Sequence, residues 1–393
     1  MQPKHVRFLD GVRGFAAAYV VLHHASINLP STYTDGAWSR GLQRVFAYGH
    51  YSVDVFIVLS GYCLALPFVS SVRRLEPSEF FVRRALRILP TYYVAALISL
   101  LLVATCVGRK TGTNWDVSIP VTRWDLVSHF LLVHDWSAGT TNKLNHAFWS
   151  IGVEWKLYFL FPALLWMRRR WGMPRAAALA TFAGYSFWLV LWAERWLNPS
   201  PWGSSVYYVG LFAMGMAAAE LGVRRPRDGR ARHELSAFVA ASLLLVAVSS
   251  SALLHLPRPV PLQIASFFVG LWTSALLVAL ERRALPFLAR TFETRPAVWL
   301  GKMGYSIYLI HAPVLQLVYQ YVIRPLDLPY ALAMPVMLVL SLTASVAAAT
   351  LLYRFVELPF HTLSRSVSVR FWPAPEGPPS VTSPRGEPET RML

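Results

Sequence analysis

Residues 331–353 read ALAMPVMLVLSLTASVAAATLLY, an unbroken run without a charged side chain. A helix that crosses a membrane needs about 20 consecutive, mostly apolar residues, so this run predicts a transmembrane helix. The composition of the whole chain agrees with that prediction. Of its 393 residues, 55% are hydrophobic and 15% are charged, and the mean hydropathy is +0.41. Soluble domains carry about 25% charged residues.

Nine further segments are long and apolar enough to span a membrane. The chain is therefore predicted to be an all-α polytopic membrane protein with about ten transmembrane helices. The expected spans are 11–29, 50–68, 88–107, 147–166, 175–193, 203–222, 235–254, 262–280, 300–323 and 331–353. The stretch 124–134 is too short to span, and we expect it at the membrane interface.

Basic residues alternate between rich and poor connections along this series. The connections after spans two, four, six and eight hold eighteen Lys and Arg residues, and the other five connections hold nine. Because basic residues concentrate on the cytoplasmic side, this bias predicts that both termini are cytoplasmic. The net charge of +17 is thereby explained by membrane topology, and nucleic acid is not expected as a partner.

The two ends of the chain differ from its body. No small-residue cleavage site follows the first apolar run, so we interpret that run as a retained span rather than a signal peptide. Residues 1–365 are predicted to form the membrane domain, and the Pro-rich residues 366–393 a disordered cytoplasmic tail. Cys63 and Cys106 lie in apolar runs without metal-ligand spacing, so no metal is expected.

Four ionisable residues lie deep inside expected spans, where a charge costs about 2.5–3.5 kcal/mol on insertion scales. His24 and His311 lie near the middle of spans one and nine, and Asp54 and Glu154 lie in the outer parts of spans two and four. By depth all four could meet in one polar pocket. An imidazole oriented by a carboxylate is suited to general-base chemistry on a hydroxyl group. His24, Asp54 and Glu154 are therefore the catalytic candidates.

A basic cluster is expected at the cytoplasmic end. In FFVRRALRILPTYY (residues 80–93), Arg84 and Arg87 are three positions apart and share one helix face. Arg13 has a similar depth in GVRGFAAAYVVLHHA (residues 11–25), roughly 16 Å from His24 along the helix. Guanidinium groups bind phosphate oxygens well, so the three could hold a phosphate-bearing donor.

Structural explanations exist for the same residues. Arg84 and Arg87 could serve only membrane topology, and the buried histidines could make interhelical hydrogen bonds. Asp54 and Glu154 could form ion pairs, and Lys156 could neutralise Glu154, although side chains two positions apart on a helix diverge. Gly11 and Gly14 are expected to permit close helix packing.

At these residues the chain resembles the membrane acyltransferase-3 family over residues 7–361. The resemblance rests on several motifs in matching order. They are LDGVRG (9–14) followed by His24, SVDVFIVLSGY (52–62), the Arg84–Arg87 pair before Pro90, FWSIGVEWKLYFLFP (148–162) with Glu154, GYSIYLIHAPV (304–314) with Tyr305 and His311, and YRFVE (353–357). The chain resembles members without a C-terminal SGNH-type hydrolase domain.

The resemblance implies a multi-pass O-acyltransferase of the cell membrane, in contact with membrane lipid. Such an enzyme moves an acyl group, usually acetyl from acetyl-CoA, to a hydroxyl of a carbohydrate or a glycosylated small molecule. It implies that Arg13, Arg84 and Arg87 bind coenzyme A, that His24 is a general base or an acyl carrier, and that Tyr305 and His311 line the substrate pocket. The alternative from buried ionisable residues is a proton-coupled transporter of a small polar solute.

Overall fold

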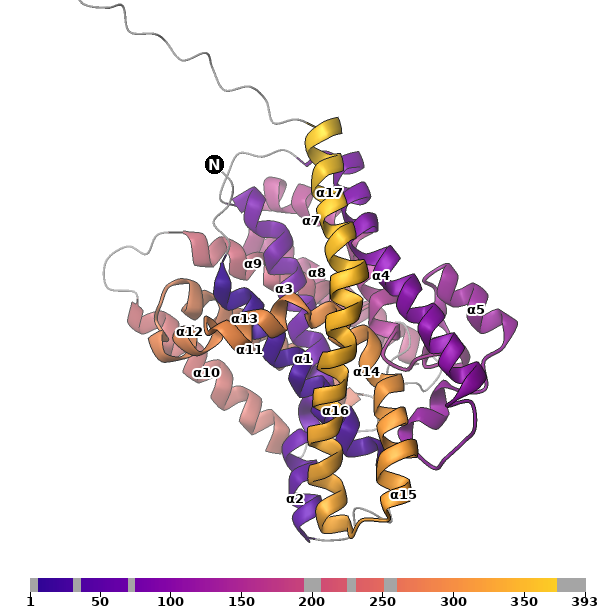
Figure 1. The fold of residues 1–393 in the computed structure, drawn as a ribbon. Coiled ribbons are helices and arrows are strands. Elements are labelled where there is room, and N and C mark those ends of the chain that lie inside the picture. The colour runs from indigo at the N-terminus through magenta and orange to yellow at the C-terminus, as the bar shows by residue number, and fades with distance from the viewer. Residues whose placement is uncertain are drawn as a thin grey trace, which may run out of the picture.

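A computed structural model of the protein describes residues 6–30, 37–69, 75–193, 206–224, 231–250 and 260–372. Across these ranges the chain is helical and has no β-strand (Figure 1). The α-helices are α1 (Arg7–Asn28), α2 (Ala37–Phe46), α3 (Ser52–Val69), α4 (Pro77–Thr105), α5 (Arg123–Phe130), α6 (Ala138–Thr141), α7 (Trp149–Trp171), α8 (Met173–Ala193), α9 (Tyr208–Val223), α10 (Ala231–Ser250), α11 (Val260–Glu281), α12 (Pro286–Phe292), α13 (Arg295–Lys302), α14 (Gly304–Val318), α15 (Arg324–Leu326), α16 (Tyr330–Leu352) and α17 (Leu358–Phe371).

Each of the ten expected spans falls on a helix of the structure, although parts of the sixth and seventh lie outside the described residues. By length and composition, six helices of the described part could cross a membrane. They are Arg40–Val69, Pro77–Thr105, Met173–Ala193, Leu262–Glu281, Gly304–Leu326 and Ala331–Ser368. The prediction of a polytopic helical membrane protein is therefore confirmed, while the count of ten spans and the sides of the two termini stay predictions.

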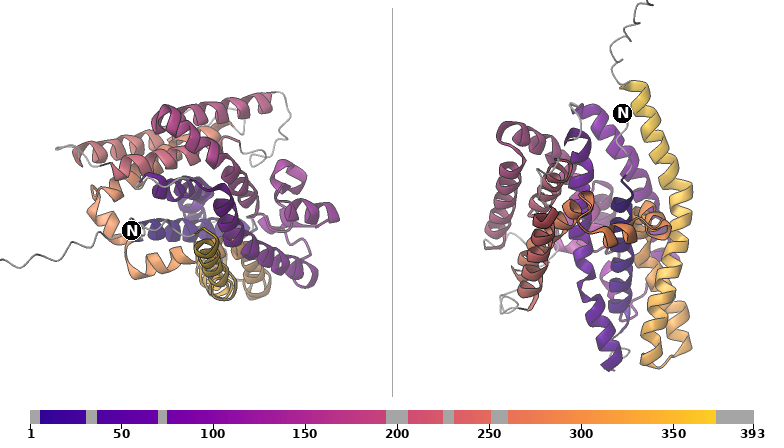
Figure 2. Two further views of the ribbon diagram at one scale, coloured as in Figure 1. Left: turned by 90° about the horizontal axis from the view of Figure 1, so that it is seen from above. Right: turned by 90° about the vertical axis from the view of Figure 1, so that its left-hand side faces the viewer.

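Helix α1 lies at the centre of the bundle and packs against α3, α13, α14 and α16 (Figure 2). Two glycines allow it to cross the α12–α13 segment at backbone contact. A Cβ atom on Gly11 would lie 1.9 Å from the carbonyl oxygen of Phe292, and one on Gly301 would lie 1.8 Å from the carbonyl oxygen of Asp10. The prediction that Gly11 permits close packing is confirmed. This crossing holds Arg13, one half-turn further along α1, against the start of α14.

A second group of helices packs on α3. Helix α9 crosses α3, and α8, α10 and α11 complete that side of the molecule (Figure 2). At one end of this group Glu220 of α9 accepts from Arg168 of α7 at 2.6 Å and from Arg224 at 2.5 Å. Arg168, which topology alone would explain, therefore also ties two helices together.

Helix α16 continues through a π-helical turn, Tyr353–Glu357, into α17, which packs against α4. Figure 1 shows the two as one long yellow column whose far end lies on the same side as the N-terminal end of α1. The helix extends to Phe371, past residue 365, where the sequence places the end of the membrane domain. Residues 373–393, the greater part of the expected tail, lie outside the described residues.

Helix α5 falls in the stretch expected at the membrane interface. Its apolar side chains point outward and its polar side chains inward, the reverse of a surface helix in a soluble protein. Trp124, Phe130 and Leu131 are 57–67% exposed, whereas Asp125 and His129 are buried. Burial lowers the pKa of the His129 imidazole, and the neighbouring His134 ring lowers it further. An outward apolar face with a polar face turned inward suits contact with lipid, which agrees with the expected placement.

Candidate active site

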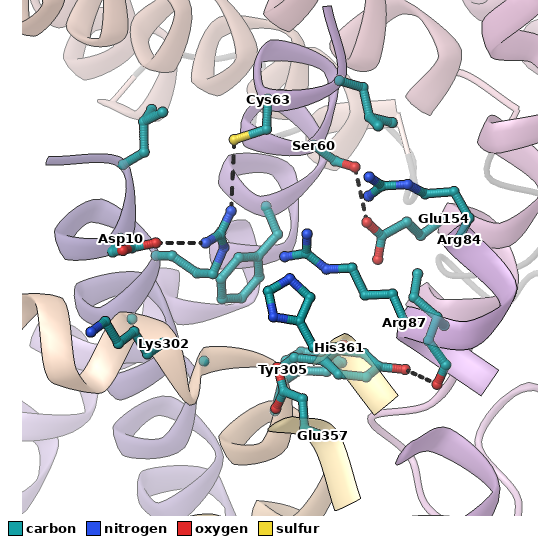
Figure 3. Close-up of a pocket in the computed structure, with 18 of the residues that line it drawn as sticks. Asp10, Ser60, Cys63, Arg84, Arg87, Glu154, Lys302, Tyr305, Glu357 and His361 are labelled. Carbon is teal, nitrogen blue, oxygen red and sulfur yellow. Dashed lines mark hydrogen bonds and ion pairs between the residues drawn. The ribbon is translucent and has the colours of Figure 1, made fainter. Parts of the chain in front are cut away.

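A cavity of about 560 Å³ opens between the N-terminal half of α1, α3, α4, α7, α14 and the start of α17. Ligand sites for small molecules commonly have volumes of about 300–1,000 Å³. Figure 3 shows that its walls come from segments far apart in the sequence, with Asp10, Glu154, Tyr305 and His361 directed into the same space. The cavity is therefore a product of the tertiary fold and not of one motif.

The walls of the cavity are basic. Five Lys or Arg residues line it against three carboxylates; the basic residues are Arg13, Arg84, Arg87, Lys302 and Arg365, and the acidic ones are Asp10, Glu154 and Glu357. The three arginines expected to bind phosphate are thus brought together, although they come from α1 and α4. Lys302, His361 and Arg365 also line the cavity, and the sequence analysis did not single them out.

Helical spacing and aromatic contacts set the positions of these arginines. Arg84 and Arg87 share one face of α4, as predicted, and neither forms an ion pair within the described part of the chain. The Arg84 guanidinium lies 5.9 Å from the ring centroids of Phe80 and Tyr158, and its Nε atom is buried without a hydrogen-bond partner. A half-buried guanidinium group without an ion pair is poised to bind an anion, because such a ligand would satisfy both its charge and its donors.

Arg13 has partners that fix its direction. Its Nη1 atom contacts Asp10 Oδ1 at 3.1 Å, and its Nη2 atom donates to Cys63 Sγ at 3.7 Å. Asp10 lies one turn back on α1, so the pair is set by local helix geometry. The guanidinium group is thereby held on the cavity wall between Asp10 of α1 and Cys63 of α3, both of which Figure 3 labels.

Glu154 lies on the cavity wall in the second turn of α7. Its Oε1 atom accepts hydrogen bonds from Ser60 Oγ at 2.9 Å and from the Tyr158 hydroxyl at 2.5 Å. These two donors can hold a carboxylate in place without a cation in direct contact. Lys156, two positions further, points away and pairs with Asp135, as the helical angle predicts.

His24 and His311 form a hydrogen-bonded pair behind the cavity wall at Tyr308, and neither lines the cavity, although His311 was expected to line the substrate pocket. His24 Nδ1 lies 2.7 Å from His311 Nε2, and His311 Nδ1 lies 2.8 Å from the backbone carbonyl oxygen of Tyr308. A carbonyl oxygen only accepts, so His311 Nδ1 carries the proton and, in the neutral ring, its Nε2 atom accepts. His24 therefore donates from Nδ1, and its Nε2 atom keeps a free lone pair.

The sequence expected a carboxylate to orient His24, and this expectation was wrong, because His311 occupies that position. A third ring, that of His146, meets His24 edge-on at a centroid distance of 5.1 Å. The ring of His23 also lies 5.1 Å from that of His24, but its Nδ1 atom donates to the carbonyl oxygen of Phe46 at 2.8 Å. The half-buried His24 is thus oriented by a relay of imidazole and backbone, not by Asp54 or Glu154.

Asp54 does not lie on the cavity. The α3 residues that line it include Val53, Phe56 and Ile57, whereas Asp54 faces α9 and α11. There it is 1% exposed and lies near Tyr208 and Ser266, with its Oδ2 atom buried and without a hydrogen-bond partner. Tyr305, in contrast, lines the cavity and donates from its hydroxyl to the carbonyl oxygen of Ile88 at 3.1 Å.

Two residues on the cavity wall lie inside the motifs used above but were not selected from the sequence. Ser150 belongs to the FWSIGVEW segment and Tyr308 to GYSIYLIH, and their hydroxyl groups are 2.7 Å apart. The signal that could have found them is position, since each lies one helical turn from an ionisable candidate. Within the described ranges, no group of three or more His, Cys, Asp or Glu residues could hold a metal ion.

Comparison with known proteins relates this geometry to a family. A model of the acyltransferase-3 family, described as an acyltransferase domain, matches residues 6–354. The match covers most of the chain, so the chain belongs to this family. The membership confirms the family resemblance found in the sequence and the prediction of an acyltransferase. With the apolar helices it also confirms a multi-pass protein of the cell membrane.

The relatives found among curated proteins include three bacterial ones. Peptidoglycan O-acetyltransferase OatA of Listeria monocytogenes is 24% identical over 332 residues, covering 80% of this chain and 50% of the relative. YrhL of Bacillus subtilis is 27% identical over 385 residues, covering 91% and 55%. O-acetyltransferase OatA of Staphylococcus aureus is 21% identical over 380 residues, covering 91% and 57%. The chain spans about half the length of these relatives. No solved structure matches it.

Proposed function

We propose that this chain is an integral membrane O-acetyltransferase that moves an acetyl group from acyl-CoA to a hydroxyl of a carbohydrate acceptor. The observation that carries the proposal is the basic cavity, which gathers Arg13, Arg84 and Arg87 and ends near the His24–His311 pair. All three relatives have names that describe O-acetyltransferases, and two of these names include peptidoglycan, a carbohydrate polymer. Family membership supports acyl transfer, and the identity of donor and acceptor belongs to the proposal.

The donor assignment rests on charge and position. Coenzyme A carries phosphate groups at one end and its thioester at the other, so its site needs cations at one end and chemistry at the other. Arg13 and His24 lie on one helix, eleven positions and roughly 16 Å apart. Arg84, Arg87, Lys302 and Arg365 add cations near Arg13. In the proposed ten-span topology this basic end of the cavity faces the cytoplasm, where acyl-CoA is made.

His24 is the proposed general base. Its Nε2 atom accepts the proton of the acceptor hydroxyl as that oxygen attacks the thioester carbonyl carbon. The tetrahedral intermediate then collapses, the carbon–sulfur bond breaks, and the His24 imidazolium returns the proton to the sulfur of coenzyme A. His311 accepts from His24 Nδ1 throughout, which keeps the base in the required tautomer.

The other candidate residues have supporting roles in this proposal. Glu154, held by Ser60 and Tyr158, contributes negative charge that stabilises the guanidinium groups and the imidazolium. Tyr305 shapes the cavity wall beside Ile88. Asp54 acts from outside the cavity, where its buried side chain beside Tyr208 and Ser266 fixes the rotation of α3 and hence of its cavity-lining face.

The test compares His24→Ala with His23→Ala in purified, reconstituted protein supplied with labelled acetyl-CoA and a panel of glycans. A general base contributes about 10²–10⁴ in rate, so His24→Ala should lose at least a hundredfold in turnover. It should still accumulate in the membrane and bind acetyl-CoA. His23→Ala, whose ring contacts Phe46 instead, should retain most turnover.

Several outcomes would contradict this assignment. Wild-type turnover in His24→Ala would show that His24 is not the general base. Absence of label transfer to every glycan would show that the acceptor is not a carbohydrate of this panel. Uptake of a polar solute driven by a proton gradient, without any label transfer, would favour the transporter alternative instead.

A further inference from the structure

The inner end of the cavity carries a pair of hydroxyl groups. Tyr308 on α14 and Ser150 at the start of α7 both line the cavity, and they are 5% and 6% exposed. Ser150 Oγ donates to the Tyr308 hydroxyl oxygen at 2.7 Å. Because the two helices meet here, the hydroxyl pair lies where the cavity approaches the histidine pair.

The direction of this hydrogen bond leaves one proton unused. A phenol has one proton to donate and lone pairs with which to accept. When Tyr308 accepts from Ser150, its own proton stays available, and no acceptor for it is found in the described part of the protein. Ser150 therefore orients the Tyr308 hydroxyl without consuming its donor, and the hydroxyl lies on the wall of a cavity large enough for a ligand.

The tyrosine is also tied to the proposed base. Its ring centroid lies 5.7 Å from that of His311, and its backbone carbonyl oxygen accepts from His311 Nδ1 at 2.8 Å. The ring of Phe56 packs edge-on against it at 5.9 Å. One turn of α14 thus presents a hydroxyl donor to the cavity and orients the imidazole relay that ends at His24.

We propose that the Tyr308 hydroxyl, oriented by Ser150, donates a hydrogen bond to the carbonyl oxygen of the acyl group being transferred. This inference rests on the proposed acyltransferase function and extends it to the residue that stabilises the transition state. When the acceptor oxygen attacks, the carbonyl π electrons move to oxygen, and the fixed donor stabilises the developing charge. When the carbon–sulfur bond breaks, the charge returns to the carbonyl, so Tyr308 keeps its proton throughout.

The experiment separates binding of the carbonyl from binding of coenzyme A. The affinity of the protein is measured for coenzyme A and for the dethia analogue of acetyl-CoA, a ketone in which CH₂ replaces the thioester sulfur. In wild type the ketone should bind more tightly than coenzyme A. In Tyr308→Phe the two affinities should become equal, while the affinity for coenzyme A itself stays unchanged.

Turnover gives a second readout. Loss of one oxyanion donor costs about 10²–10³ in kcat, so kcat of Tyr308→Phe should fall by that factor, while KM for acetyl-CoA should rise no more than the affinity for the ketone falls. Ser150→Ala keeps the phenol but loses its orientation, so it should show the same pattern to a smaller degree. Tyr185→Phe is the control, because it removes a tyrosine hydroxyl that donates to Gln263 outside the cavity. It should leave the affinity for coenzyme A, the affinity for the ketone and kcat unchanged.

The outcomes are distinguishable from failure of the proposed function. If wild type transfers acetyl groups but Tyr308→Phe and Ser150→Ala retain wild-type kcat and the preference for the ketone, the carbonyl site is wrong and the acyltransferase stands. If Tyr308→Phe fails to accumulate, Ser150→Ala alone decides by the same two readouts. If wild type binds neither coenzyme A nor the ketone, the donor assignment itself fails.

Discussion

At the scale of single residues, Arg84 and Arg87 give the sharpest test of the donor site. Both line the cavity, and neither has an ion-pair partner among the described residues. A hydrogen bond to a charged group contributes about 1.5–3 kcal/mol, which is about 10- to 150-fold in affinity. Arg84→Ala and Arg87→Ala should each weaken acetyl-CoA binding by such a factor, as measured by calorimetry on purified protein.

The same helix supplies a matched control for this prediction. Arg83 is adjacent in sequence but pairs with Glu79 at 3.2 Å and does not line the cavity. Arg83→Ala removes the same charge from outside the cavity and should leave the affinity for acetyl-CoA close to that of wild type. Equal losses of acetyl-CoA affinity in all three variants would mean that only the overall charge matters. Unchanged affinity in Arg84→Ala and Arg87→Ala would mean that these arginines serve only membrane topology.

Local spacing explains which site residues could be found from the sequence. Arg84 and Arg87 are three positions apart, and helical periodicity alone places them on one face. The partner of His24 could not be found in this way, because His311 is 287 positions away and meets it only when α14 packs on α1. Asp54 shows a second limit. Counting residues along a span gives depth in the membrane, but not the direction in which the side chain points.

At the scale of helices, the crossing of α1 over α12 and α13 can be tested through its glycine. A Cβ atom at Gly11 would lie 1.9 Å from a backbone carbonyl oxygen, so Gly11→Ala must push the helices apart. Overpacking of this kind costs about 1–3 kcal/mol, and it should also displace Arg13. We expect a lower thermal unfolding midpoint in detergent and weaker acetyl-CoA binding.

Gly41 on α2 provides the comparison, since a Cβ atom there would meet nothing within 4 Å. Gly41→Ala should hold or raise the unfolding midpoint, because alanine favours a helix by about 1 kcal/mol over glycine. An unchanged midpoint and unchanged binding in Gly11→Ala would show that the close crossing is not needed to position Arg13.

The existence of the helices could be predicted because it depends on long apolar runs, whereas the residues at which they begin and end were harder to predict. Helix α4 begins at Pro77, eleven residues before the expected span, because the segment that carries Arg84 and Arg87 is helical and packs against α17. Span nine was expected from residue 300, but residues 295–302 form the separate helix α13. Its close contact with α1 comes from the fold and has no periodic signal in the sequence.

At the scale of the whole molecule, the arrangement of the helices agrees with the cytoplasmic placement of both termini. The N-terminal end of α1 and the far end of α17 lie on the same side of the bundle (Figure 1). The cavity residues Arg13, Arg87 and Arg365 come from the halves of their helices nearest that side. Basic residues concentrate on the cytoplasmic side of membrane proteins, so this end of the cavity should face the cytoplasm. The proposed donor site therefore requires the proposed orientation, because acyl-CoA is cytoplasmic.

Paired reporters in two connections can test this orientation. Green fluorescent protein becomes fluorescent when it folds in the cytoplasm, and alkaline phosphatase becomes active when it folds outside. In the basic connection between α9 and α10, residues 224–230, only the fluorescent fusion should give a signal, because this connection carries four arginines. In the connection between α4 and α5, residues 106–122, only the phosphatase fusion should be active. The reverse pattern would place the basic mouth of the cavity outside the cell, away from cytoplasmic acyl-CoA, and would overturn the donor assignment together with the orientation.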